Sequence, residues 1–453
     1  MRKKQSLPVK PREAALQALV RVEQDEAYLN LLMPSLTAAL AGEDKALALQ
    51  LAAGTIQRLN TLDWAINHFA RRPLDTNTRW IRNLLRLGAY QLLYLDRIPV
   101  YAAIDETVKL ARRYGHRGVA GLVNAVLRRL ARESNALPWP DPESDPLTYL
   151  ALKESHPFWL VSRALDRFGF REAEKWCRAN NFKAPLSLRP NVMRTKIPEL
   201  IKNLAAEGIT VQESPLVPGM LRLIGGGNPA SAAAFKEGLF SIQGESSAIV
   251  VPLLEPAAGK TFVDLCSAPG GKTTHLAELI GDQGLIIAVD LYHSRLQLVE
   301  KAARRLGLHS IKTMAADGLK IDTSSLPVPA AVLVDAPCSG LGVIRRLPEI
   351  KWRRREEELL TFHNRQCALL QAAADLLPPG GKLLYSVCTT EPEETGQVKD
   401  FFERHNQQFI PLKIGRKLPE LLCRGREQDE QLYLWPHLDG LDGFYIAGWQ
   451  KMR

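Results

Sequence analysis

Hydrophobic residues recur at helical spacing over the first third of the chain. The stretch 11–22 places Leu16, Leu19 and Val22 at intervals of three, as on one face of a helix. The same period returns in segments 80–95, 102–115 and 121–133. Strand-like alternation does not interrupt these segments. The pattern predicts a small all-helical domain over residues 1–140.

Proline then breaks the helical pattern. The segment 133–146 contains four prolines, which end helices and stiffen linkers, so we expect a domain boundary there. Two helical stretches and two short strands are predicted beyond it, at 158–169, 172–181, 186–191 and 221–226. They indicate a small α+β module over residues 147–235.

From about residue 236 the pattern changes to short apolar runs separated by helical stretches. The runs are rich in β-branched residues and occupy 261–266, 284–290, 310–315, 329–337 and 380–388. This alternation is typical of a doubly wound parallel sheet with helices on both faces. We therefore predict a multidomain chain whose third part, residues 236–453, is an α/β domain.

Composition supports a large folded protein and adds a charge asymmetry. The chain has 453 residues, of which 46% are hydrophobic, enough for two or three domains. No apolar run is long enough for a membrane span, and the N-terminus lacks the pattern of a secretory signal, so we expect a cytoplasmic protein. Residues 1–140 hold 21 Lys and Arg against 12 Asp and Glu, or +9 of the total charge of +10. Such a field favours a nucleic-acid partner over a basic surface that serves solubility alone.

The six cysteines form neither a disulfide framework nor a metal motif. No Cys-x-x-Cys pair occurs, so we expect no zinc site and no other metal. Cys177, Cys367 and Cys423 are interpreted as small buried hydrophobes.

The segment DLCSAPGGKTTH (264–275) ends like a phosphate-binding loop. Such a loop requires a glycine five residues before Gly271, where this chain has Cys266, and Pro269 removes one backbone donor. A nucleoside triphosphatase is therefore not expected. The segment still joins a strand to a helix, where Gly270 and Gly271 let a ligand approach the backbone.

Acidic residues and two cysteines follow the strands of the predicted sheet. Asp264, Asp290, Asp317 and Asp335 each lie at or just after a strand. At such a rim, Asp290 suits ribose hydroxyls and Asp317 an adenine amino group. Cys338 and Cys388 follow the last two of these strands. Helix capping is an alternative role that would explain any single aspartate, but it explains the whole set poorly.

Two thiols beside a carboxylate suit one demanding reaction. Carbon 5 of cytosine becomes nucleophilic only after a thiolate adds to carbon 6, and a base must later remove the carbon 5 proton. Cys388, Asp335 and Cys338 supply a nucleophile, a group for the cytosine edge and a base. Two unrelated buried cysteines are the alternative.

Three segments together resemble the motifs of the RNA cytosine-C5 methyltransferases. They are DLCSAPGGKTTH (264–275), DAPCSGLGVIRRLPEIKW (335–352) and YSVCTTEPEE (385–394). The resemblance implies a Rossmann-like (class I) methyltransferase domain that uses S-adenosylmethionine. Segment 100–130 resembles a NusB-like RNA-binding domain, which is found in the branch of the family that acts on bacterial 16S ribosomal RNA.

The resemblance also implies roles for individual residues. The cofactor would be held by Cys266, Ser267, Ala268, Pro269, Gly270, Gly271, Lys272, Asp290, Asp317 and Asp335. Cys388 would be the nucleophile, Cys338 would assist product release, and Asp335 would also bind the cytosine edge. The chain departs from the family's Gln-Asp-Ser-Ser run, because Gly244 takes the acidic place and Glu245 follows it.

Basic residues near these motifs are candidates for phosphate contacts, although a solvated helix face is equally compatible with each arginine. They are Arg112, Arg113, Arg117, Arg128 and Arg129 in the helical domain and Arg345, Arg346 and Lys351 after the Cys338 loop, with 188–195 as a further candidate. The expected substrate is 16S ribosomal RNA, naked or in early small-subunit particles, and the expected state is a monomer. Transfer RNA as substrate, or an inert NusB-like assembly factor, are the alternatives.

Overall fold

The computed structural model describes residues 10–321 and 326–453 in two compact units. Unit 1 comprises Met1–Phe182 and Ile344–Arg354, and unit 2 comprises Lys183–Val343 and Arg355–Arg453. Residues 1–9, where we expected no secretory signal, lie outside the described part. No described helix has the length and apolar character needed to cross a membrane.

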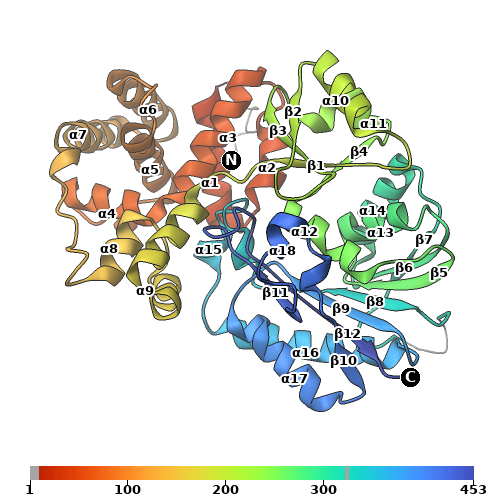
Figure 1. Cartoon of the computed structure of the whole chain (residues 1–453). Helices are drawn as coiled ribbons and strands as arrows, with labels where there is room; N and C mark the ends of the chain where they lie inside the picture. Colours follow the sequence, from red (N-terminus) through yellow and green to blue (C-terminus); the bar gives the residue numbers. More distant parts are fainter. Residues whose placement is uncertain (1–9, 322–325) are drawn as a thin grey trace. The chain divides into compact units, whose positions relative to one another are not determined.

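Unit 1 contains helices and no strand among its described residues, which confirms the helical prediction (Figure 1). Its helices are α1 (Pro11–Asp25), α2 (Leu29–Leu36), α3 (Gly42–Gln57), α4 (Leu59–Phe69), α5 (Arg79–Tyr94), α6 (Val100–Tyr114), α7 (Arg117–Glu133), α8 (Pro146–Lys153), α9 (Phe158–Asn181) and α15 (Ile350–Arg353). Helices α1 to α7 enclose one apolar core.

Helix α7 shows how the sequence pattern becomes packing. Val119, Val123, Val126 and Leu130 recur at helical spacing and are all buried. The His116 side chain accepts a hydrogen bond from the backbone N–H of Gly118 and so caps the first turn. Each fully buried side chain contributes about 1.5–3 kcal/mol of hydrophobic free energy to the folded state.

Two helix boundaries are set by proline and glycine. We predicted a linker up to residue 146, but its last proline begins α8, because proline suits the first helical position and Asp145 caps the helix through Thr148 N–H at 3.0 Å. The two helical stretches predicted over 158–181 form α9, which is interrupted at Gly169 (φ 69°, ψ 172°).

A short segment from late in the sequence completes unit 1. Lys351 is 1% exposed and its Nζ donates to the carbonyl of Ser155 at 2.6 Å and to Asn181 Oδ1 at 3.3 Å. Trp352 Nε1 donates to the Ile56 carbonyl at 2.6 Å. The buried carboxylate of Glu349 accepts from the Leu29 N–H at 2.8 Å. The helical unit is therefore discontinuous in sequence.

Unit 2 contains a small antiparallel sheet of four strands in the order β2-β3-β1-β4. Its elements are β1 (Ser187–Pro190), α10 (Ile197–Ala206), β2 (Thr210–Glu213), β3 (Leu221–Gly225), α11 (Ala233–Lys236) and β4 (Phe240–Ile242). The predicted strands correspond to β1 and β3. The prediction missed the short strands β2 and β4.

The second sheet of unit 2 has the order β10-β12-β9-β8-β5-β6-β7, with β11 also paired to β12. Its elements are α12 (Glu245–Val250), β5 (Lys260–Leu265), α13 (Gly271–Leu279), β6 (Gly284–Asp290), α14 (His293–Leu306), β7 (Ile311–Ala315), β8 (Ala331–Asp335), α16 (Glu358–Leu376), β9 (Lys382–Val387), α17 (Gly396–His405), β10 (Phe409–Pro411), α18 (Glu420–Cys423), β11 (Gln431–Leu434) and β12 (Phe444–Lys451).

The five predicted strands are β5 to β9, and they are parallel as expected. The sheet as a whole is mixed, since β10, β11 and β12 join it in antiparallel pairs. Alternate residues of each parallel strand face opposite cores. Phe262 belongs to the core under α12 and α13, whereas Val263 belongs to the core under α16 and α17. Figure 1 shows these two pairs of helices on opposite faces of the sheet.

Replacement of Lys351 by alanine is expected to destabilise the protein by about 2–4 kcal/mol, because it leaves a cavity and an unpaired buried carbonyl. Burial, with Arg58 nearby, lowers the pKa of Lys351 well below its ordinary value of 10.5. The unfolded state therefore binds more protons between the two pKa values, and the stability difference between wild type and variant grows as pH rises through that range. Denaturant unfolding at pH 7 and pH 9.5 measures both effects.

The exposed Arg117 provides a matched control, and Arg117→Ala should change stability by less than about 0.5 kcal/mol. A Lys351→Ala variant as stable as Arg117→Ala would contradict the structural role of Lys351.

Candidate active site

The predicted site residues converge because they follow parallel strands. Strands β5 and β8 are neighbours from which the chain proceeds in opposite directions across the sheet, to β6 and to β9. The carboxyl ends on either side of such a switch point leave a crevice that binds ligands in open α/β sheets. Asp290 and Asp335 are the last residues of β6 and β8, and the segment 266–272 and Cys388 directly follow β5 and β9 at the same edge.

The glycine loop has a backbone that few other residues could adopt. Gly270 has φ 101°, and a Cβ there would lie 3.1 Å from Val299 Cα. Cys266 also has a positive φ of 63°, where a non-glycine residue is strained. Burial, with carboxylates nearby, raises the pKa of Cys266 to about 12. Its thiol is therefore protonated at neutral pH and unsuited to nucleophilic attack.

The carboxylate of Asp290 joins the glycine loop to the start of α14. Asp290 is buried, and it accepts from the backbone N–H of Ala268 at 3.3 Å and of Tyr292 at 3.1 Å. Arg295 forms an ion pair with it at 3.3 Å and donates to the Ala268 carbonyl at 3.0 Å. The ends of β5 and β6 are thus connected by charged hydrogen bonds.

Asp264 lies beneath the loop rather than on the rim. It is fully buried, and Thr273 donates to its Oδ2 at 2.6 Å. Its Oδ1 has no hydrogen-bond partner among the described residues. Burial, with Asp335 nearby, raises the pKa of Asp264 to about 7. A cationic group bound beside it would be stabilised by this carboxylate.

Asp335 is held between two side chains at the end of β8. Lys272 Nζ lies 2.7 Å from its Oδ2, and Ser386 donates to its Oδ1 at 2.8 Å. Lys272 is itself buried, with the Phe444 ring centroid 5.1 Å from its Nζ. Asp335 keeps about a third of its side chain exposed and remains able to accept further hydrogen bonds. Ser386 received no role from the sequence, although it lies two residues before Cys388.

The sulfur atoms of Cys338 and Cys388 lie 3.3 Å apart, close enough for one thiol to donate to the other. The hydrogen bond with Cys388 and burial raise the pKa of Cys338 well above its ordinary value. Backbone contacts fix the surroundings, since the N–H of Gly342 donates to the Cys388 carbonyl at 3.0 Å and the N–H of Gly443 donates to the Gly342 carbonyl at 2.8 Å. A side chain on Gly342 would collide with Gly443.

Glu394 supports both cysteine loops, a role that the sequence analysis missed. Its Oε2 accepts from the Ser339 N–H at 2.8 Å and from Gln366 Nε2 at 3.1 Å, and that same Nε2 also donates to the Pro337 carbonyl at 3.0 Å. Ser339 and Thr389, the residues after the two cysteines, hydrogen-bond at 3.1 Å. The motif ending in Glu394 was noted, but only the fold shows which loops it reaches.

The remaining predicted residues are Asp317, which follows β7, and the basic residues outside the glycine loop. Asp317 is half-buried and accepts the N–H of Leu319 at 3.1 Å. Arg112, Arg113, Arg117, Arg128 and Arg129 are exposed on α6 and α7, and Arg345 and Arg346 are half-buried in unit 1. Arg113 and Arg129 form ion pairs with Glu13 and Glu133. The buried, paired Lys351 does not suit a phosphate contact, which corrects that expectation.

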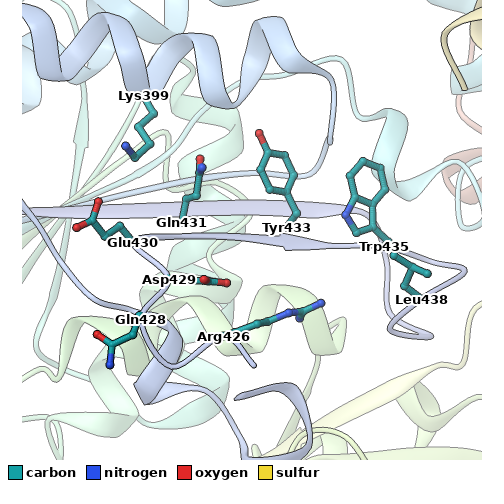
Figure 2. Close-up of a pocket in the computed structure, with 9 residues that line it drawn as sticks. All are labelled: Lys399, Arg426, Gln428, Asp429, Glu430, Gln431, Tyr433, Trp435 and Leu438. Carbon is teal, nitrogen blue, oxygen red and sulfur yellow. The ribbon is translucent and has the colours of Figure 1, made fainter. Parts of the chain in front are cut away.

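A separate cavity of about 470 Å³ lies beside β11. Figure 2 shows the side chains that line it. Its lining consists of Lys399, Arg426, Gln428, Asp429, Glu430, Gln431, Tyr433, Trp435 and Leu438. Lys399 and Arg426 already pair with Glu403 and Asp439 at 2.8 Å, and two acidic residues balance their charge. The Tyr433 hydroxyl donates to Thr395 Oγ1 at 3.0 Å, so one wall adjoins the Glu394 segment. This cavity lacks the excess positive charge that would favour a phosphate.

Three family models match successive parts of the chain. The NusB family matches residues 9–132, the ferredoxin-like domain of RsmF/B-like methyltransferases matches 156–228, and the 16S rRNA methyltransferase RsmB/F model matches 251–450. The last model spans the large sheet with both cysteine loops.

Whole-chain relatives agree with these matches. A Bacillus subtilis protein named "Probable ribosomal RNA small subunit methyltransferase B" is 38% identical over 97% of this chain and 98% of its own length. The chain belongs to this methyltransferase family. A Cronobacter sakazakii "Ribosomal RNA small subunit methyltransferase B" is 35% identical over 87% of this chain and 90% of its own.

Solved structures show the same architecture. The crystal structure of PH0851 superposes with a TM-score of 0.82 at 28% identity, over 99% of this chain and 100% of that one. A "Methyltransferase Homolog Protein from Pyrococcus Horikoshii" gives a TM-score of 0.58 at 26% identity, over 69% and 100%. The predicted combination of a NusB-like domain, an α+β module and a Rossmann-like methyltransferase domain is therefore confirmed.

Replacement of Cys388 by alanine is expected to lower the pKa of Cys338, because the partner that raises it most is removed. Alkylation of Cys338 by iodoacetamide, followed by mass spectrometry across pH, should show a midpoint at lower pH than in wild type. Each pKa unit corresponds to about a tenfold change in thiolate fraction below the midpoint. Increased access alone would raise the maximal rate without moving the midpoint.

Cys423 serves as the internal reference in that experiment, since its alkylation profile should not change. An unmoved midpoint for Cys338 would show that the two thiols do not share a proton.

Proposed function

We propose that the chain transfers a methyl group from S-adenosylmethionine to carbon 5 of a cytosine in 16S ribosomal RNA. Cys388 forms a temporary covalent bond to carbon 6 of that cytosine. The observation that carries this proposal is the 3.3 Å approach of Cys388 to Cys338, beside the Asp335 carboxylate held by Lys272 and Ser386.

The raised pKa of Cys338 supports Cys388 as the nucleophile. Within a pair that shares a hydrogen bond, the sulfur that holds its proton acts as donor and stabilises negative charge on the other. Cys388 gives its proton to water and adds to carbon 6, and the electron pair of the 5,6 double bond moves towards the N3 side of the ring. Carbon 5 then becomes nucleophilic.

Asp335 and Lys272 suit the cytosine edge. The exposed part of Asp335 accepts a hydrogen bond from the exocyclic amino group, and Lys272 forms an ion pair with the carboxylate at 2.7 Å. Developing negative charge at N3 is balanced by the nearby ammonium group. These groups orient the base, which must leave its stack to reach Cys388.

The residues around the glycine loop fit S-adenosylmethionine. The unpaired Oδ1 of buried Asp264 is an acceptor suited to a cation, and Gly270 keeps the backbone free of a side chain. The loop 266–272 would hold the methionine part, Asp290 the ribose hydroxyls and Asp317 the adenine. When bound, this cofactor supplies an electrophilic methyl group on a positively charged sulfur.

Cys338 suits the last step, loss of the carbon 5 proton. Once Cys388 is bonded to carbon 6, it no longer shares a hydrogen bond that raises the pKa of Cys338. Cys338 then gives its own proton to water more easily and, as a thiolate, takes the carbon 5 proton. The electron pair of the carbon 5–hydrogen bond re-forms the 5,6 double bond, and Cys388 leaves carbon 6 as a thiolate that regains a proton from water. Both thiols thereby return to their initial state.

The ribosomal substrate rests on the relatives, which are named as small-subunit ribosomal RNA methyltransferases. Exposed arginines of α6 and α7 suit the phosphate backbone, and of the five candidates Arg112, Arg117 and Arg128 form no ion pair with other described residues. The cytoplasmic location, the monomeric state and the domain limits 1–140, 147–235 and 236–453 stay predictions.

Covalent trapping tests the assignment of the two thiols. Wild type, Cys338→Ala and Cys388→Ala are incubated with S-adenosylmethionine and 16S ribosomal RNA, and adducts are resolved on a denaturing gel. Cys338→Ala should accumulate an RNA adduct, because it adds to the base but does not release it. Cys388→Ala should form none, and its methyl transfer should fall by at least about a thousandfold.

Cys423→Ala is the matched control and should behave as wild type. An adduct only in Cys388→Ala would reverse the two roles. Methylation of transfer RNA in preference to 16S RNA would change the substrate, and no adduct or methyl transfer with either RNA would favour the inert assembly factor.

A further inference from the structure

A buried ion pair connects the small four-stranded sheet to helix α13. Arg189, on β1, is 4% exposed and Glu278, on α13, is 3% exposed. Arg189 Nε donates to Glu278 Oε2 at 3.1 Å, and Nη2 donates to Oε1 at 2.9 Å. Two parallel hydrogen bonds between a guanidinium and a carboxylate fix both distance and orientation.

The same guanidinium also reaches the end of the glycine loop. Arg189 Nη1 donates to the Gly271 carbonyl at 2.9 Å and to Gln243 Oε1, while Nη2 donates to Thr274 Oγ1 at 3.2 Å. Together with the two bonds to Glu278, these contacts provide an acceptor for each of the five N–H groups of arginine. A lysine has three donors on one atom and could not span this set.

Gly271 is the residue where the loop becomes helix α13. Gly270 lies close to Val299 and has a positive φ, so its backbone can adjust little. A movement of Gly271 would therefore not be absorbed at Gly270 and would displace the loop before it. Arg189 holds the Gly271 carbonyl from the side of β1. Segment 188–195 was expected to guide RNA, but this side chain faces the protein interior.

We propose that Arg189 is a positioning residue for the cofactor loop, so that the small sheet contributes to S-adenosylmethionine affinity. This inference rests on the proposed function of loop 266–272. Arg189 acts through Gly271 and Thr274. Glu278 keeps the guanidinium in place, and Gln243 shares its Nη1.

A second ion pair provides a matched control. Arg222, on β3 of the same sheet, donates two hydrogen bonds to Glu245 at the start of α12, at 2.8 and 2.6 Å. Glu245 is buried, and no described contact of Arg222 involves the residues of the glycine loop. Replacement of either arginine by lysine weakens one bidentate pair, but only Arg189 contacts the loop.

The experiment compares full-length wild type, Arg189→Lys and Arg222→Lys by isothermal titration with S-adenosylmethionine and by thermal unfolding. Both variants should lose some thermal stability. Arg189→Lys should weaken cofactor binding by about tenfold, as expected for loss of charged hydrogen bonds, and raise KM for the cofactor more than it lowers kcat. Arg222→Lys should bind as wild type does.

Arg189→Met combined with Glu278→Gln removes the pair without leaving a buried charge, and it should also bind about tenfold more weakly. Equal affinity in wild type and both Arg189 variants would overturn the positioning role, as would an equal loss in Arg222→Lys. Failure of wild type itself to bind S-adenosylmethionine would instead overturn the proposed function.

Discussion

The site depends on the parallel pairing of β5, β8 and β9. In this register Leu265 pairs with Val334, and Asp335 pairs with Ser386. The loop with Cys338 starts directly after Asp335, and Cys388 follows Ser386 by two residues, so equal strand ends bring the two sulfurs together. A slip of one residue would turn alternate side chains to the opposite face and separate Asp335 from Ser386. The apolar cores on both faces of the sheet oppose such a slip.

In addition to strand pairing, two buried ionisable side chains hold the loops of the site in place. Arg189 donates to the glycine loop and α13, and Glu394 accepts from the segments beside Cys338. In both cases one buried side chain forms hydrogen bonds with backbone groups of a loop. A buried charge is costly unless it is paired or fully hydrogen-bonded, and Arg189 meets this condition, so it tolerates few alternative positions of the glycine loop. Burial raises the pKa of Glu394, whose Oε1 has no hydrogen-bond partner among the described residues. Both side chains connect loops of the site to the regular elements beside them, and so restrict the movement of those loops.

The sequence was sufficient to predict features that depend on local pattern. Helical periodicity around Leu16 and Val126 located the bundle, and apolar runs before Asp290 and Asp335 located the parallel strands. Their order along the chain implied a common edge for the cysteines, because parallel strands end on the same side. The antiparallel strand β12 was not predicted as part of this sheet, because its neighbour β9 lies more than fifty residues earlier.

Features that depend on contacts between distant segments were beyond the sequence pattern. Neither Arg189 nor Glu394 differs in local context from a surface residue, and only the fold brings the former to Gly271 and the latter to Ser339. Glycine at position 244 departs from the family motif, yet it precedes Glu245, whose carboxylate is satisfied by Arg222. In this chain the acidic side chain therefore lies one residue later than in the family motif, and it forms a buried ion pair.

Lys351 was misassigned for a related reason. The basic residues after the Cys338 loop resemble a polyanion-binding run, but Lys351 is buried in unit 1 and Arg353 donates to the Ala27 carbonyl at 2.7 Å. A lysine can enter a core when its methylene chain is packed and its ammonium finds carbonyl acceptors, as at Ser155. This segment begins six residues after Cys338, where the chain passes from unit 2 into unit 1. A basic residue in such a run can therefore belong to the core of the helical unit rather than to a surface that meets a polyanion.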